Sequence, residues 1–130
     1  MPLLKFDVMK GRTEEEIRSL LDAAHEAMVE AFDVPESDRY QSLTQHNPGE
    51  LILRDTGLGY TRSERVVLLT VVSRPRTKEQ KQDFYALLAR RLKEKCGLSA
   101  DDLMVSLVEN RDEDWSFGRG KAEFVTGELE

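Results

Sequence analysis

The chain has 130 residues, a formal net charge of -6 at pH 7 and a single cysteine. That length suits one domain, the lone cysteine excludes an internal disulfide framework, and the acidic balance argues against unspecific binding to nucleic acid. No apolar run approaches the roughly 20 residues of a membrane span, and the first residues lack the basic and apolar stretches of a secretory signal. We therefore expect one cytoplasmic domain over residues 1–130, with no nucleic-acid or membrane partner.

The first half of the chain has the pattern of a strand, a helix and a second strand. Leu3–Met9 has the composition of a strand. Residues 13–32 place apolar side chains at helical spacing behind a capping box of Thr13 and Glu16, which predicts an amphipathic helix. Residues 39–45 have the pattern of the next strand. The apolar stripe of the predicted helix consists of Ile17, Leu20, Leu21, Ala24, Met28, Ala31 and Phe32.

The second half repeats this order. Residues 66–72 are continuously apolar, as in a strand that is buried on both faces. Residues 77–96 form a predicted helix that opens with Thr77 and Gln80 and precedes Gly97, a residue that suits a helix C-terminus. Residues 103–109 complete the unit as a strand. The stripe of this helix consists of Phe84, Leu87, Leu88 and Leu92.

An offset of 64 residues relates the two halves, which indicates a tandem β-α-β repeat over about 2–46 and 66–110, with a tail at 111–130. We predict an α+β fold with a four-stranded, mainly parallel sheet and both helices on one face. The uncovered face predicts a closed homo-oligomer, for which the duplication favours a homotrimer. The aligned segments are Arg12-Thr13-x-Glu15 with Arg76-Thr77-x-Glu79, residues 34–38 with 98–102, and Ser42-Leu43 with Ser106-Leu107.

Two segments lie outside the repeat. Residues 50–55 have the pattern of a short strand, and residues 55–60 that of a loop punctuated by glycine. The tail is mostly polar with a few large apolar residues, so we expect it either to fray or to pack on a neighbouring copy.

Pro2 follows the initiator methionine, whose removal would leave a secondary amine at the start of the first strand. Such an amine can act as base, acid or nucleophile, and nearby cations or burial lower its pKa. The alternative is that a proline is simply tolerated at the first position of a strand.

Arg74 and Arg76 flank Pro75 where the apolar strand leads into the second helix. In extended backbone, residues i and i+2 lie on the same side, so two guanidinium groups can hold one carboxylate. The alternative is that Arg76, like Arg12, is a solvated residue before a capped helix. Asp38 lies in the predicted turn after the first helix, where it either orients a water or caps the turn.

The remaining reactive residue types form no recognisable site. His25, His46 and Cys96 lack the spacing of a zinc site or of a nucleophilic triad. We expect both histidines to be structural or exposed and Cys96 to be a half-buried thiol at a helix end. The apolar tail residues could wall a pocket or fill an interface: Trp115, Phe117, Phe124 and Leu129.

Several segments, in their order and spacing, form a specific set. They are Pro2 with Leu3-Leu4-Lys5-Phe6, Asp38-Arg39-Tyr40-Gln41-Ser42, Gln45-His46, Asp55-Thr56-Gly57-Leu58-Gly59-Tyr60, Ser73-Arg74-Pro75-Arg76 and Asp114-Trp115-Ser116-Phe117-Gly118-Arg119-Gly120. Over essentially its whole length, the chain resembles the malonate semialdehyde decarboxylases of the tautomerase superfamily.

The resemblance implies a homotrimer of the tautomerase fold and a carboxy-lyase that needs neither metal nor cofactor. The implied reaction converts malonate semialdehyde, a small carboxylate substrate, into acetaldehyde and carbon dioxide, with hydration as a side activity. Pro2 would be the catalytic proline, Arg74 and Arg76 would bind the carboxylate, and Asp38 would position Pro2 or a water. The implied hydrophobic wall consists of Trp115, Phe117, Phe124 and Leu129.

Other functions stay open on these residues. A hydratase or dehalogenase of unsaturated three-carbon acids, or a keto-enol tautomerase of small 2-oxo acids, would also use Pro2 and an arginine. A non-catalytic trimeric binding protein is expected if Met1 is retained, because Pro2 would then carry an amide. Within the decarboxylase, Pro2 either donates a hydrogen bond as an ammonium group or forms an iminium as a neutral amine.

Overall fold

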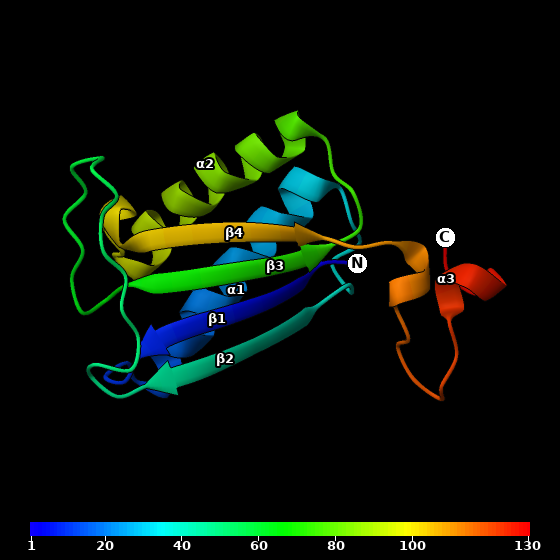
Figure 1. Cartoon of the computed structure of the whole chain (residues 1–130), viewed down its shortest axis with the longest axis horizontal. Helices are drawn as coiled ribbons and strands as arrows, with labels where there is room; N and C mark the ends of the chain where they lie inside the picture. Colours follow the sequence, from blue (N-terminus) through cyan, green and yellow to red (C-terminus); the bar gives the residue numbers. More distant parts are fainter.

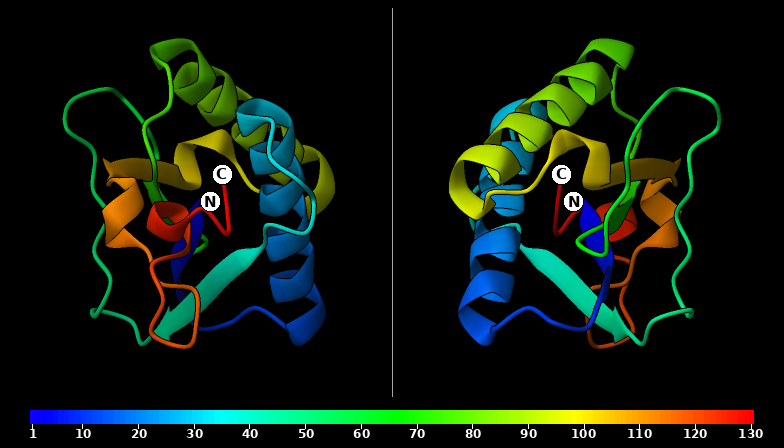
Figure 2. Two further views of the ribbon diagram at one scale, coloured as in Figure 1. Left: turned by 90° about the vertical axis from the view of Figure 1, so that its right-hand side faces the viewer. Right: turned by 90° about the vertical axis from the view of Figure 1, so that its left-hand side faces the viewer.

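The computed structural model describes residues 1–130 as a four-stranded sheet with two long helices (Figure 1). Both long helices lie on one face of the sheet, and the tail extends beyond one end of it (Figures 1 and 2). No helix is long and apolar enough to cross a membrane. The elements are β1 (Leu3–Met9), α1 (Glu14–Phe32), β2 (Tyr40–His46), β3 (Val67–Ser73), α2 (Lys78–Cys96), η1 (Ala100–Asp102), β4 (Leu103–Glu109), η2 (Asp112–Asp114) and α3 (Glu123–Thr126).

The strand order is β2-β1-β3-β4. Each outer strand runs parallel to the first strand of its own repeat, so that Leu3 pairs with Tyr40 and Val67 with Leu103. The two central strands run antiparallel, with Leu3 beside Val72. The predicted α+β fold is confirmed, with both helices on one face. The central antiparallel pair makes the mainly parallel sheet a mixed one.

The core lies between the sheet and the helices. Alternate residues of β1 and β3 face it, and Phe6 and Leu69 are almost completely buried. Phe32 and Phe84, from the two helices, pack with ring centres 4.9 Å apart. Burial of these apolar side chains supplies the main driving force for docking the helices on the sheet. The residues of the core are Leu4, Phe6, Val8, Leu20, Ala23, Ala24, Ala27, Met28, Phe32, Val67, Leu69, Val71, Phe84, Leu87, Leu88, Leu92 and Leu98.

Both predicted capping boxes are confirmed. Thr13 Oγ1 accepts from the Glu16 backbone N–H at 3.1 Å, and the Glu16 side chain accepts from the Thr13 N–H at 2.9 Å. Thr77 and Gln80 make the same pair of bonds at 3.0 and 2.9 Å. Gly97 ends α2 in the left-handed region with φ of 66°, a conformation that glycine adopts without a steric penalty.

The offset of 64 residues holds for the first strand and the helix of each repeat, whereas β2 and β4 are 63 residues apart. The bounds of β1 and β3 differ by 64, as do those of α1 and α2. Adding 64 to the buried Phe6, however, gives Thr70, which lies on the open side of β3. The core-facing residues of these two strands are thus displaced by one position relative to the helices. The segments that the sequence aligns at this offset lie outside these two strands.

The sheet face opposite the helices is covered by no helix. Its centre is polar, with Lys5 beside Thr70. Met104 and Val108 on β4 are 43% and 50% exposed. Self-association through this face stays a prediction.

Residues 50–55 do not form the predicted strand. The sheet has four strands, and none pairs with this segment. It belongs to the long loop between β2 and β3 at the left end of the sheet in Figure 1, and Ile52 is 69% exposed. Gly49, just before this segment, lies in a turn with φ of 89°, and no strand of the sheet pairs with the residues that follow.

The tail packs on its own chain, whereas the sequence suggested fraying or contact with a neighbouring copy. The ring centre of Phe117 lies 5.5 Å from that of Tyr40, the first residue of β2. Phe124 on α3 is 9% exposed. These aromatic contacts bring the C-terminus beside the N-terminus (Figure 2).

Candidate active site

The topology explains how residues that are distant in sequence meet at one end of the sheet. Because β1 and β3 are antiparallel, the start of β1 lies beside the end of β3, which leads directly into Arg74 and Arg76. Because β1 and β2 are parallel, the segment before β2 brings Asp38 to the same end. Pro2 is buried where these segments converge, and Met1 is half-buried in front of it.

A pocket of about 370 Å³ opens at this point. We refer to it as the amine pocket. It brings together the chain terminus, both arginines, Asp38 and two apolar residues of the tail. Its lining residues are Met1, Asp33, Val34, Pro35, Asp38, Arg74, Arg76, Phe124, Leu129 and Glu130.

Arg76 is fixed from beneath by the end of β3 and by α1. Its Nε donates to Ser73 Oγ at 3.0 Å, and Nη1 donates to the Phe32 carbonyl at 3.4 Å. The guanidinium carbon lies 5.0 Å from the centre of the Phe32 ring. Burial, with the charge of Arg74 nearby, lowers the pKa of Arg76, and Asp38 acts in the opposite direction. An anion in the pocket would relieve both effects.

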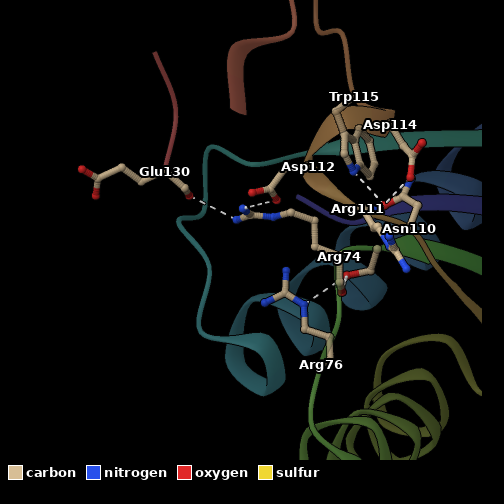
Figure 3. Close-up of polar contacts among 9 residues, drawn as sticks. Arg74, Arg76, Asn110, Arg111, Asp112, Asp114, Trp115 and Glu130 are labelled. Carbon is tan, nitrogen blue, oxygen red and sulfur yellow. Dashed lines mark hydrogen bonds and ion pairs between the residues drawn. The ribbon is translucent and has the colours of Figure 1, made fainter. Parts of the chain in front are cut away.

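Arg74 is held by the tail. Its Nη1 donates to Asp112 at 3.0 Å, and Nη2 donates to the Glu130 carbonyl at 3.1 Å. Its guanidinium carbon lies 3.9 Å from the centre of the Phe124 ring, within the range of a cation–π contact. Figure 3 shows the Arg74 and Arg76 guanidinium groups pointing to the same side, as the spacing of two residues predicts.

The terminal amine of Met1 lies in the field of these charges. Burial, followed by the charges of Arg76 and Arg74, lowers its pKa from 8.0 to about 6, whereas Asp38 and Asp112 raise it. An amine with that pKa is mostly neutral at pH 7 and can therefore accept a proton or attack a carbonyl.

The four predicted wall residues occupy two layers. Phe124 and Leu129 line the amine pocket, but Trp115 and Phe117 do not. Phe117 meets the edge of Phe124 at 5.5 Å between ring centres, and Trp115 stacks on Phe117 at 5.4 Å. Trp115 Nε1 donates to Asn110 Oδ1 at 2.8 Å. In the single chain, Trp115 and Phe117 thus support the wall from behind.

Comparison with known proteins identifies the family to which the chain belongs. Two family models, each described as tautomerase enzyme, match residues 38–118 and 2–60. A Bacillus subtilis (strain 168) protein described as probable tautomerase YrdN is 52% identical over 99% of this chain and 100% of its own length. The chain belongs to the tautomerase family. A second protein of that strain, probable tautomerase YusQ, is 31% identical over 96% of the chain and 99% of its own length.

Two solved structures that are similar to this tautomerase are malonate semialdehyde decarboxylases. The chain is 65% identical to malonate semialdehyde decarboxylase, whose crystal structures address its decarboxylase and hydratase activities, with a TM-score of 0.96 and 98% of both chains covered. A second malonate semialdehyde decarboxylase, inhibited by 3-bromopropiolate, is 41% identical with a TM-score of 0.93, covering 98% and 97% of the two chains. The predicted resemblance is confirmed. A fused 4-OT described as a symmetric trimer shares the fold, with 22% identity, a TM-score of 0.77 and coverage of 96% and 98%.

Sequence reasoning missed three supporting groups of this tautomerase. Ser73 is fully buried and accepts from Arg76, while its hydroxyl donates to the Arg74 carbonyl at 2.8 Å. Asp112 and the Glu130 carbonyl fix Arg74. Ser73 stands next to the arginine pair in sequence, so its position offered a signal. Nothing in the polar tail distinguishes Asp112 from its acidic neighbours.

The histidines lie outside the amine pocket. His25 is buried with Nε2 at 2.7 Å from the Glu36 carbonyl, and His46 Nε2 lies 2.8 Å from Asp7. No group of three or more His, Cys, Asp or Glu side chains could hold a metal ion. The charged groups that line the amine pocket are the terminal amine, Arg74 and Arg76, with the acidic residues Asp33, Asp38 and Glu130.

Proposed function

We propose that this tautomerase decarboxylates malonate semialdehyde to acetaldehyde and carbon dioxide, through the amine of Pro2 after removal of Met1. The observation that carries the proposal is the meeting of the chain terminus and two arginines in one pocket with an apolar wall. The likeness to malonate semialdehyde decarboxylase supports the choice of substrate.

The arginines supply the binding of a carboxylate. Arg76 uses Nε and Nη1 for bonds within the chain, and no bond engages its Nη2. Arg74 contributes positive charge from the side of the tail, where Asp112 and Glu130 hold it. Charge-assisted bonds from two guanidinium groups fix the carboxylate of a short β-oxo acid and leave its aldehyde near the amine.

The amine supplies the electron sink. Loss of carbon dioxide from a β-oxo acid leaves an electron pair that forms a new carbon–carbon double bond, so the carbonyl oxygen, or an iminium nitrogen in its place, must accept the displaced electrons. A neutral Pro2 amine would add to the aldehyde, release water and form an iminium, which becomes an enamine as carbon dioxide leaves. A protonated Pro2 would instead donate a hydrogen bond to the aldehyde oxygen and stabilise the enolate. Mass analysis after borohydride treatment with substrate distinguishes the two, since only an iminium is trapped on the chain.

The apolar wall favours the neutral product. Phe124 and Leu129 border the pocket, so the carboxylate is held by arginines beside a surface that solvates charge poorly. Conversion to carbon dioxide removes the anionic charge from that surface. Asp38 lies in the same pocket and is the group that would orient a water for the hydratase side reaction.

A keto-enol tautomerase is the second candidate, because both Bacillus subtilis relatives are described as probable tautomerases. It would use the same amine to move a proton between carbon and oxygen. Parallel assays with malonate semialdehyde and with the enol of a small 2-oxo acid separate the two functions through their specificity constants.

The primary test measures acetaldehyde by nuclear magnetic resonance with protein whose N-terminus is established by intact mass. Wild type is compared with Pro2→Ala and Arg76→Gln, and Arg90→Gln serves as the control because Arg90 is exposed on α2. We expect Arg76→Gln to lower kcat/KM at least about tenfold, the value of one charge-assisted bond, and Arg90→Gln to leave it unchanged. Absence of acetaldehyde from Met1-free wild type refutes the decarboxylase proposal.

We extend the proposal to a homotrimer. The open sheet face with its exposed Met104 and Val108 supports an assembly through β4 and its surroundings. Light scattering should give three times the chain mass of 14.9 kDa. A monomeric mass at micromolar concentration contradicts this.

A further inference from the structure

A second pocket, at the opposite end of the sheet, is related to the amine pocket by the internal repeat. We call it the Arg12 pocket; its volume is about 390 Å³, close to that of the amine pocket. The offset of 64 converts six lining residues of one pocket into lining residues of the other. The pairs are Met1 and Arg65, Asp33 and Gly97, Val34 and Leu98, Pro35 and Ser99, Asp38 and Asp102, and Arg76 and Arg12.

The same strand geometry builds both pockets. The end of β1 lies beside the start of β3, since Val8 pairs with Val67. Arg12 follows β1 and Arg65 precedes β3, just as Arg76 follows β3 and Met1 precedes β1. Each pocket therefore has an arginine from a strand–helix junction opposite the segment that enters the neighbouring strand.

The Arg12 pocket lacks a reactive amine. The position of Pro2 corresponds to Val66, whose nitrogen is a backbone amide that donates to the Ser63 carbonyl at 3.4 Å. A peptide nitrogen cannot act as base or nucleophile in the way a terminal amine can. What the second pocket retains is a cavity of similar size with a guanidinium group on its wall.

Arg12 is the cation in this pocket that forms no ion pair with a carboxylate. Its Nη2 donates to the Arg65 carbonyl at 2.6 Å, and no carboxylate pairs with it. Arg65 pairs with Glu16 at 2.9 Å, and Lys95 pairs with Glu26 at 3.0 Å. Burial, followed by the charge of Arg65, lowers the pKa of Arg12, whereas Glu16, Cys96 and Asp102 act in the opposite direction.

Three acidic residues line the pocket, and two of them, Glu16 and Asp102, are engaged within the chain. Glu15 is exposed and pairs with no cation of the pocket. Asp102 is 4% exposed, and its two oxygens accept from the Ser63 N–H and Ser63 hydroxyl, each at 2.6 Å. It holds the loop before β3 and leaves Arg12 open to an external anion. The ligand class that fits a half-buried guanidinium in a pocket of this size is a small carboxylate.

We propose that the Arg12 pocket is a second carboxylate site, which binds a small monocarboxylate through Arg12 and does not transform it. This inference rests on the repeat and on the contacts of Arg12, and it stands whether or not the amine pocket decarboxylates malonate semialdehyde. Cys96 provides a reporter, because it is the single cysteine of the chain and lines this pocket.

The test compares alkylation of Cys96 by iodoacetate, a carboxylate, and by iodoacetamide, its neutral analogue. In both reactions the thiolate sulfur bonds to the CH2 carbon, iodide leaves and the thiol proton passes to solvent. The rate with iodoacetate is divided by the rate with iodoacetamide, and this ratio in folded protein is divided by the same ratio in urea-unfolded protein. The result measures how strongly the pocket favours the carboxylate reagent. We expect this ratio to fall about tenfold in Arg12→Gln, to be partly retained in Arg12→Lys and to be unchanged in Arg76→Gln.

A second measurement uses only the wild type, so it remains valid if the Arg12→Gln variant fails to fold. Propanoate should slow the reaction of Cys96 with iodoacetamide in a saturable manner, whereas propanamide and chloride at matched concentration should not. Equal ratios in wild type and folded Arg12→Gln overturn the proposal. Protection that chloride reproduces, or the absence of protection by propanoate, also overturns it.

Discussion

Replacing Arg76 by Gln should raise the pKa of the Met1 amine in chains that retain Met1. The pKa of that amine is lowered from 8.0 to about 6 by burial first, by Arg76 second and by Arg74 third. Gln keeps most of the volume of the side chain and removes its positive charge. The cation that disfavours the ammonium form is lost, while burial and Arg74 remain, so the pKa should rise without reaching 8.0.

The effect is large at neutral pH. With a pKa of about 6, about nine tenths of the amine is neutral at pH 7, whereas with a pKa of 8.0 only about one tenth is neutral. Arg76→Gln should therefore reduce the neutral fraction substantially. Asp112→Asn should act in the opposite direction, because Asp112 raises the amine pKa in the wild type. The two variants form a pair with opposite expected signs.

Trace acylation of the terminal amine with acetic anhydride measures this pKa directly. The N-terminal peptide is quantified by mass spectrometry from about pH 5 to about pH 9, the range that brackets both values. Each protein is first checked by intact mass, so that every compared chain retains Met1, the residue whose amine carries the lowered pKa. A wild-type midpoint near 8, or the same midpoint in Arg76→Gln, would refute the electrostatic account of the pocket.

Three further substitutions test the contact that positions Arg76, the cap of α2 and the packing of the core. Ser73→Ala removes the acceptor of Arg76 Nε, and should raise KM with a stability loss of about 1 kcal/mol in urea unfolding; an unchanged KM contradicts a positioning role. Thr77→Ala removes a helix cap and should cost about 1 kcal/mol, and an unchanged unfolding midpoint would show that the cap is dispensable. Phe84→Ala should cost about 3–5 kcal/mol because Phe84 is fully buried against Phe32, and a loss below about 1 kcal/mol would contradict that packing.

Local patterns predicted the repeated elements well because the local signals were unambiguous. Each helix begins where a threonine and a residue three positions later can cap each other, as Thr13 and Glu16 do. The apolar spacing then identified the buried faces, so that Leu20 and Leu88 lie in the core as expected. These features depend on neighbours within a few residues, which a sequence displays directly.

Features that depend on distant contacts were predicted less well. The strand pattern at 50–55 has no partner strand, and apolar spacing alone cannot reveal that. The tail was not expected to reach Tyr40 and Arg74 of its own chain, because aromatic stacking across the end of the sheet leaves no periodic trace. The partnership of Arg74 with Asp112 was missed for the same reason.

The antiparallel pairing of β1 with β3 explains why a duplicated unit provides two pockets but only one candidate reactive centre. Each central strand starts beside the end of the other, so both ends of the pair place an arginine, Arg76 or Arg12, opposite the segment that enters a strand. A polypeptide has a single N-terminus, however, and only one of the two pockets can contain a terminal amine. The Arg12 pocket is then free to retain the binding of a carboxylate without the chemistry. If carboxylate protection of Cys96 persists in Arg76→Gln, binding at the Arg12 pocket is independent of the amine pocket, as this argument from the fold requires.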